Sequence, residues 1–195
     1  MFPQKTLQQT PSQTVGPFFH GGLLIGDEHV LVESQTLGQP IRIVGTVYDG
    51  AGQPVPDALI EIWQADAQGY FNHAADEHQA LADRHFRGFG RSGTNEHGQF
   101  VFQTVRPGPV AGRGGAMQAP HISVRVFARG LLIHAVTRLY FPDENANATD
   151  AVLNAIDDPA RRQTLIAVHE AVAGAPAYRF DIRLQGERET VFFEP

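Results

Sequence analysis

The 195-residue sequence contains no cysteine and only 15 lysine and arginine residues. Without cysteine, neither a disulfide framework nor a thiolate metal site can form. The basic residues are scattered along a chain with a net charge of −6 and a pI near 5.8. Binding to nucleic acid requires clustered positive charge, so the composition excludes that class of function.

The sequence also lacks a long apolar run. No stretch approaches the roughly 18 residues that cross a bilayer, and residues 1–19 do not show the charged and apolar regions of a signal peptide. We therefore expect a soluble cytoplasmic protein without membrane contacts. Charged residues make up 18% of the chain, below the roughly 25% of typical soluble proteins, which predicts that a partner covers part of the surface.

The most regular pattern lies between His121 and Phe141. Apolar residues occupy every second position from Ile122 to Ala128, which predicts a strand with two different faces. An extended apolar pattern resumes at Leu131, after Arg129-Gly130. We therefore predict a two-residue hairpin that carries His121 and Ser123 on one face and Arg129 at its tip.

Several other stretches predict strands, and short helices come only late in the chain. Strands are expected over Ile41–Tyr48, Ala58–Trp63, Gln99–Val105 and Tyr178–Leu184. Residues 150–157 predict one short helix, and Asp158 as N-cap with Pro159 predicts the start of another. The fold class is all-β: an antiparallel β-sandwich with long loops, an irregular N-terminal arm and short C-terminal helices. We divide the chain into an arm and loop that pack on a partner, residues 1–40, and a sandwich domain, residues 41–195.

Two local patterns imitate functional motifs. Gly88–Gly93 matches the G-x-G-x-x-G fingerprint of dinucleotide sites, but a turn and a strand follow it instead of a helix. His73, His78 and His85 lie close together in sequence, yet their spacing does not place them on one helix face. We interpret the first as a loop and the histidines as solvated or interface residues.

A longer pattern resembles the signature of the intradiol ring-cleavage dioxygenases, which use ferric iron to open catechols between their two hydroxyls. The matching positions are Ile43, Gly45, Val47, Gly52, Val55, Ile60, Glu61, Ile62, Gly69 and Phe71. Further similar segments are Thr10–Pro17, Glu61–Asp66, Val105–Gly108, Ala119–Ile122 and Tyr178–Arg183. The similarity therefore covers nearly the whole chain and implies a β-sandwich enzyme of aromatic catabolism, in the beta-ketoadipate pathway.

The resemblance also implies a metal site, which this sequence does not complete. Family members hold ferric iron with two tyrosines and two histidines. The matching positions here are His78, where the alignment is loose, and Val110, His121 and Ser123. Valine has no donor atom and a serine hydroxyl is a poor ligand at neutral pH, so these positions resemble a vestigial site without metal, and His121 is interpreted as a structural histidine.

Within the family, the chain is similar to the alpha subunits that do not bind iron. The resemblance implies that a beta subunit holds the ferric iron and that the complex cleaves protocatechuate with O2 to 3-carboxy-cis,cis-muconate. No residue of this chain alone is then catalytic. Thr14, Gly16, Pro17 and Arg129 match positions that contribute to the substrate pocket of the partner.

Two alternatives remain open. In the first, the chain is a purely structural assembly subunit that contributes aromatic residues such as Phe18, Phe19, Phe192 and Phe193 to an interface, and Arg129 is neutral. In the second, it is a self-sufficient enzyme that uses His73, His78, His85 and His121 on another metal, which their spacing disfavours.

Overall fold

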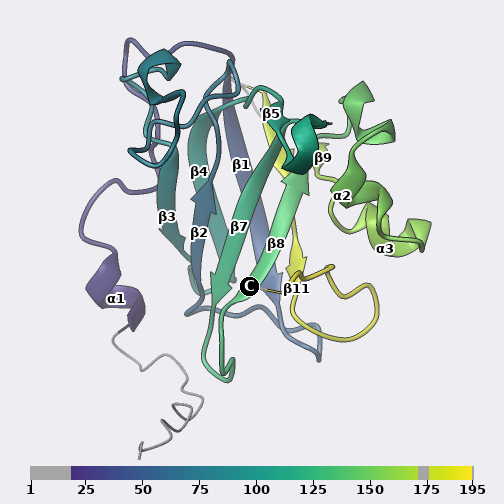
Figure 1. Ribbon diagram of the computed structural model, residues 1–195. Coiled ribbons are helices and arrows are strands. Elements are labelled where there is room, and N and C mark those ends of the chain that lie inside the picture. Colours follow the sequence, from purple (N-terminus) through teal and green to yellow (C-terminus); the bar gives the residue numbers. More distant parts are fainter. Residues whose placement is uncertain (1–18, 171–175, 195) are drawn as a thin grey trace, which may run out of the picture.

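The computed structural model describes residues 19–170 and 176–194, and Figure 1 shows two stacked β-sheets. In the first sheet, β1 pairs antiparallel with β4 but parallel with β10 and β11, and β10 pairs antiparallel with β9. Its strands are β1 (Pro40–Tyr48), β4 (Gln99–Val105), β9 (Val168–Glu170), β10 (Ala177–Arg179) and β11 (Ile182–Arg183). The predicted all-β sandwich is confirmed, with one mixed sheet.

The second sheet has the order β3-β2-β7-β8, and all its neighbouring strands are antiparallel. Its strands are β2 (Leu59–Trp63), β3 (Phe89–Gly93), β7 (His121–Phe127) and β8 (Ala135–Tyr140). A separate short hairpin pairs β5 (Val110–Ala111) with β6 (Met117–Gln118).

The core lies between the inner faces of the two sheets. Buried and less buried residues alternate along β1 and β7, as their period of two predicts. Ile43 and Val47 of β1 and Val124 and Val126 of β7 belong to one continuous apolar cluster. Burying each such side chain stabilises the fold by about 1.5–3 kcal/mol. Since the core occupies the inner faces, the outer faces of the two sheets are available for function.

Short helices lie on opposite sides of the sandwich (Figure 1). On one side, α1 (Phe19–Leu23) places the Phe19 ring 5.4 Å from that of Phe127. On the other side lie α2 (Ala151–Asn154) and α3 (Pro159–Gln163), and α3 begins after Asp158, the predicted cap. Asp150 accepts from the N–H of Leu153, and Asp158 accepts from that of Ala160. The 3-10 helices are η1 (Gln79–Leu81), η2 (Arg113–Gly115) and η3 (Asn145–Ala148). Within the described residues, no helix is long and apolar enough to cross a membrane.

The segment before β1 packs on the sandwich of its own chain. Leu31 is 1% exposed in the core, and its N–H donates to the carbonyl of Gln103 at 2.8 Å. Thr14, Gly16 and Pro17, with Phe18, lie outside the described residues. The division of the chain at residue 40, into an arm that packs on a partner and a sandwich domain, stays a prediction.

The predicted two-residue hairpin is wrong. Residues 128–134 connect β7 to β8, and β8 begins at Ala135 rather than at Leu131. The Phe127 ring lies 5.4 Å from the Phe19 ring and 5.2 Å from that of His134, while Arg129 turns back toward Asp57. With these contacts, residues 128–134 form a loop and do not continue the pairing of β7 with β8.

Two further strand boundaries differ from the prediction. Residues 89–93, expected in a loop, form β3. Gly90 of this strand is buried, and Leu31 packs so closely on it that there is no space for a Cβ. The stretch from Tyr178 to Leu184 is divided between β10 and β11. At the break, a carboxylate oxygen of Asp181 accepts the N–H of Thr46 at 3.1 Å, in the position of a backbone acceptor.

Candidate functional site

The outer face of the second sheet carries two adjacent rows of functional side chains. In one row, Glu61 of β2 lies opposite Arg91 of β3 and Arg125 of β7. The carboxylate of Glu61 is buried and accepts from Arg91 Nε at 2.7 Å. Arg125 is exposed and forms no ion pair with any residue that the structure describes. The row therefore carries one uncompensated positive charge.

The neighbouring row is mainly aromatic. Trp63 lies opposite Phe89 on one side and Ser123 on the other. Together with His73 and Val136, the rows line a hollow of about 450 Å³. Ser123 therefore faces an open space with aromatic and charged walls.

A second hollow, of about 760 Å³, adjoins the first, since Trp63 and His73 line both. The Trp63 ring stacks on Phe71 at 5.7 Å, and the His73 ring meets it edge-on at 5.8 Å. His78 and Val110 line this second hollow. The structure thus places Ser123, His78 and Val110, three of the four positions that the resemblance predicts as vestigial ligand positions, in two adjoining hollows.

His121, the fourth position, is held by its own chain. Its Nδ1 lies 2.8 Å from the carbonyl oxygen of Ala119, so Nδ1 carries the hydrogen and donates it. Burial lowers the pKa of His121, and the charge of Arg138 lowers it further, which keeps the imidazole neutral. Asp150 supports this arrangement by accepting from the Ala119 N–H at 2.8 Å and from the Tyr140 hydroxyl at 3.2 Å. Burial also raises the pKa of Tyr140 to about 12.

These positions do not fit ferric iron. Val110 is 7% exposed and has no side-chain donor, and its backbone pairs with Gln118 in the short hairpin. The residue before the hairpin, Pro109, packs closely against Gly69. Gly69 has φ +92° and lies so close to the Pro109 carbonyl that a Cβ would collide with it. Within the described ranges, no group of three or more histidine, cysteine, aspartate or glutamate side chains could hold a metal ion. A hard ferric ion would meet two imidazoles, one hydroxyl and no phenolate at these positions.

Arg129 lies in the connection between β7 and β8, apart from both hollows. Its Nε is 3.0 Å from Asp57 Oδ2, and the two side chains are 70% and 38% exposed. The other oxygen of Asp57 is buried without a hydrogen-bond partner in the described structure. Sequence analysis missed Asp57, because nothing in the turn before β2 indicates an arginine from a distant loop.

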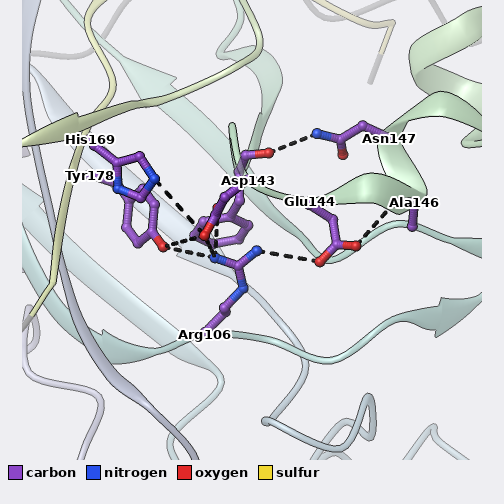
Figure 2. Close-up of polar contacts among 8 residues, drawn as sticks. Arg106, Asp143, Glu144, Ala146, Asn147, His169 and Tyr178 are labelled. Carbon is purple, nitrogen blue, oxygen red and sulfur yellow. Dashed lines mark hydrogen bonds and ion pairs between the residues drawn. The ribbon is translucent and has the colours of Figure 1, made fainter.

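A polar cluster that the sequence did not reveal is centred on Arg106 (Figure 2). Its Nη1 lies 2.9 and 3.0 Å from the two oxygens of Asp143 and 2.7 Å from the Tyr178 hydroxyl. Its Nη2 lies 3.3 Å from Glu144, and its guanidinium covers the Phe141 ring at 4.6 Å. Arg106 directly precedes the Pro107–Pro109 loop, so the cluster holds the loop that carries Val110. The signal in the sequence was Arg106 itself, because it lies in Val105–Gly108, one of the segments that carry the family resemblance.

This cluster shifts the pKa of its members. Burial favours a higher pKa for Asp143, but the hydrogen bond and charge of Arg106 outweigh it and lower that pKa. Burial favours a lower pKa for Arg106, and the hydrogen bond to Asp143 raises it instead. His169 lies 3.9 Å from Asp143, and its ring packs 5.0 Å from that of Tyr178. The cluster is thus an ion-pair network that joins β4, β9, β10 and the segment after β8.

Comparisons with known proteins show what the chain resembles. A family model described as Dioxygenase matches residues 15–186. The protocatechuate 3,4-dioxygenase alpha chain of Pseudomonas putida is 46% identical, over 98% of this chain and 99% of that protein. The beta chain from Burkholderia cepacia is 32% identical, over 84% of this chain and 72% of that protein. The solved dioxygenase domain of a carbohydrate-binding fusion protein from Streptomyces sp. SirexAA-E superimposes with a TM-score of 0.62 at 30% identity, covering 81% of this chain and 87% of that one.

Proposed function

This chain belongs to the family of intradiol ring-cleavage dioxygenases, and we propose that it is the alpha subunit of a protocatechuate 3,4-dioxygenase. Its reaction would be the cleavage of protocatechuate with O2 to 3-carboxy-cis,cis-muconate, carried out in a complex with a protocatechuate 3,4-dioxygenase beta subunit. Similarity to an alpha chain along the whole length and to a beta chain along most of it supports a hetero-oligomer of two related subunits.

The observation that carries this proposal is Val110. By the family resemblance it matches the position of a tyrosinate ligand, and it is buried with no donor atom in its side chain. The same resemblance matches Ser123 to a second ligand histidine, so this chain would lack two of the four donors that the family uses to hold iron. The ferric iron of the enzyme would be held by the beta subunit, which leaves this chain a role in binding and positioning substrate.

We assign the binding role to Arg129, with backbone of Thr14, Gly16 and Pro17 as a further wall of the partner's pocket. Protocatechuate carries a carboxylate, for which a guanidinium fork is suited. Arg129 must first leave Asp57, and an exposed ion pair of this kind contributes about 0–1 kcal/mol. A charge-assisted hydrogen bond in a drier pocket contributes about 1.5–3 kcal/mol, so the exchange favours the substrate.

One observation favours the alternative of a purely structural assembly subunit. The ion pair with Asp57 already satisfies Arg129 within its own chain. The aromatic residues suggested as interface anchors do not support that alternative as strongly, because Phe19, Phe192 and Phe193 are half-buried against their own chain. Phe18 lies outside the described residues.

Arg129→Ala, made in the complex with the beta subunit, tests the assignment. We expect assembly and iron content to stay unchanged and kcat/KM for protocatechuate to fall about tenfold or more, with a smaller loss for catechol, which has no carboxylate. Arg84→Ala is the matched control, since Arg84 is an exposed arginine whose side chain bonds only to His85 in the described structure. Unchanged turnover of protocatechuate by Arg129→Ala would leave the chain a structural subunit.

A further inference from the structure

A third hollow, separate from those described above, lies on the outer side of the first sheet. Its volume is about 400 Å³, and it is bordered by the end of β1, by β10 and β11, and by the residues that end α3. Three arginines line it, Arg179, Arg183 and Arg188, with Asp181 as the one carboxylate. Such a concentration of positive charge is unexpected on a chain with a net charge of −6.

The nearby carboxylates neutralise only part of this charge. Asp181 uses one oxygen for Arg179 Nη1, at 3.2 Å, and the other for the Thr46 N–H, at 3.1 Å. Glu170 also pairs with Arg179, at 3.1 Å from Nε. Glu189 is paired with Arg161. Arg179 is therefore balanced by two carboxylates, and neither of them extends to the other two arginines.

Arg183 is positioned without an anion. Its guanidinium lies over the Tyr48 ring at 4.6 Å, and it has no ion pair among the residues that the structure describes. Its backbone N–H donates to Thr190 Oγ1 at 2.9 Å. Thr190 is 1% exposed and also lines the hollow, and the described residues supply no acceptor for its hydroxyl hydrogen.

Arg188 reaches the hollow from an unusual backbone conformation. With φ at 61°, it is the one residue other than glycine in the described chain that has positive φ. Its side chain is exposed and has no hydrogen bond or ion pair within the described part of the chain. A left-handed conformation at a residue with a side chain is disfavoured, and such outliers concentrate at functional sites.

We propose that this hollow is an anion-binding site for a small multivalent oxyanion bearing carboxylate or phosphate groups, held between Arg183 and Arg188. Guanidinium groups match the planar geometry of two oxygen atoms on either kind of ligand. The hollow falls in the size range of small-ligand pockets, about 300–1,000 Å³. Thr190 would donate its free hydroxyl hydrogen to the same anion. The site does not depend on the function proposed above.

Calorimetric titration of the purified full chain tests the proposal, with inorganic phosphate and citrate as separate probes at constant ionic strength. We expect at least one probe to bind once per chain, and the stronger of the two identifies the ligand as phosphate-like or carboxylate-like. Arg183→Gln and Arg188→Gly should each weaken that binding about tenfold or more, because each removes a charge-assisted contact. Arg84→Gln, which changes an exposed arginine elsewhere, should not.

Arg188→Gly also separates binding from folding, because glycine adopts positive φ readily and the variant should unfold at a temperature no lower than that of the parent chain. The proposal is overturned if neither probe binds more tightly than chloride, or if both variants bind as the parent does. Weaker assembly with the beta subunit in these variants, together with no binding of either probe, would also overturn it and identify the hollow as a subunit interface.

Discussion

Several arginines form ion pairs within the described residues. Among these, replacing Arg106 by leucine should destabilise the chain most. Leucine keeps apolar contact with the Phe141 ring but removes the hydrogen bonds to Asp143, Tyr178 and Glu144. Breaking a buried ion pair costs about 3–5 kcal/mol. The Arg106 side chain is 17% exposed and that of Asp143 44%, so water screens part of this loss, and we expect about 2–3 kcal/mol.

For a chain of this length, 1 kcal/mol shifts Tm by about 2–4 °C, so the expected decrease is about 4–12 °C. The matched control is Arg179→Leu. Arg179 also pairs with two carboxylates, but its side chain is 50% exposed, which predicts a loss below about 1 kcal/mol. Thermal unfolding followed by circular dichroism measures both variants.

The ion pair of Arg106 with Asp143 also predicts that the stability of the chain depends on pH. Although burial opposes it, Arg106 lowers the pKa of Asp143 in the folded chain. A lowered folded pKa stabilises the fold above the unfolded pKa, about 3.9 for aspartate, and this stabilisation is lost as the pH falls through the folded value. The difference between parent and Arg106→Leu should be complete at neutral pH and shrink below about pH 4. Equal Tm shifts for Arg106→Leu and Arg179→Leu would refute the account of this cluster.

Two further predictions concern Asp57 and Asp150. Asp57→Asn frees Arg129 from its ion pair, so kcat/KM of the complex for protocatechuate should rise, by no more than about fivefold, because the exposed pair contributes at most about 1 kcal/mol; a tenfold decrease would instead mean that Asp57 positions Arg129. Asp150→Ala leaves the N–H groups of Ala119 and Leu153 and the Tyr140 hydroxyl without their buried acceptor, and urea unfolding should show a loss of about 3 kcal/mol or more. The control Asp158→Ala removes an exposed cap and should cost about 0.5–2 kcal/mol.

The correctly predicted strands include β1 and β4, along which buried and less buried residues largely alternate. Ile41–Tyr48 and Gln99–Val105 agree with β1 and β4 to within one residue. The start of α3 was also predictable, because Asp158 and Pro159 act locally. In each of these stretches, local preference and tertiary packing favour the same structure.

The sequence was less informative where distant contacts decide the structure. β3 contains Gly90 and Gly93, which disfavour strands, yet it pairs with β2 along its whole length, and Leu31 packs where a Cβ of Gly90 would lie. At the break between β10 and β11, the carbonyl of Phe180 lies so close to Gly45 that a Cβ there would collide with it. Neither of these close contacts can be predicted from the pattern of apolar residues in a single segment.

The candidate site divides in the same way. That Val110 and Ser123 supply no adequate ligands follows from their residue types once the family resemblance marks these positions, and the alternation of β7 placed Ser123 on the face opposite Ile122 and Val124. The ion pairs of Arg129 with Asp57 and of Arg106 with Asp143 were not visible, because each joins loops that only the folded sandwich brings together. Thr14, Gly16 and Pro17 stay predictions from the family resemblance.

The most direct test of the alpha-subunit role is the iron content and the visible spectrum of this chain, purified with and without the beta subunit. Because Val110 and Ser123 supply no adequate ligands, the chain alone should be colourless and contain no stoichiometric iron, whereas the co-purified complex should be coloured by tyrosinate bound to ferric iron. Stoichiometric iron with a visible absorption band in the isolated chain would contradict the account.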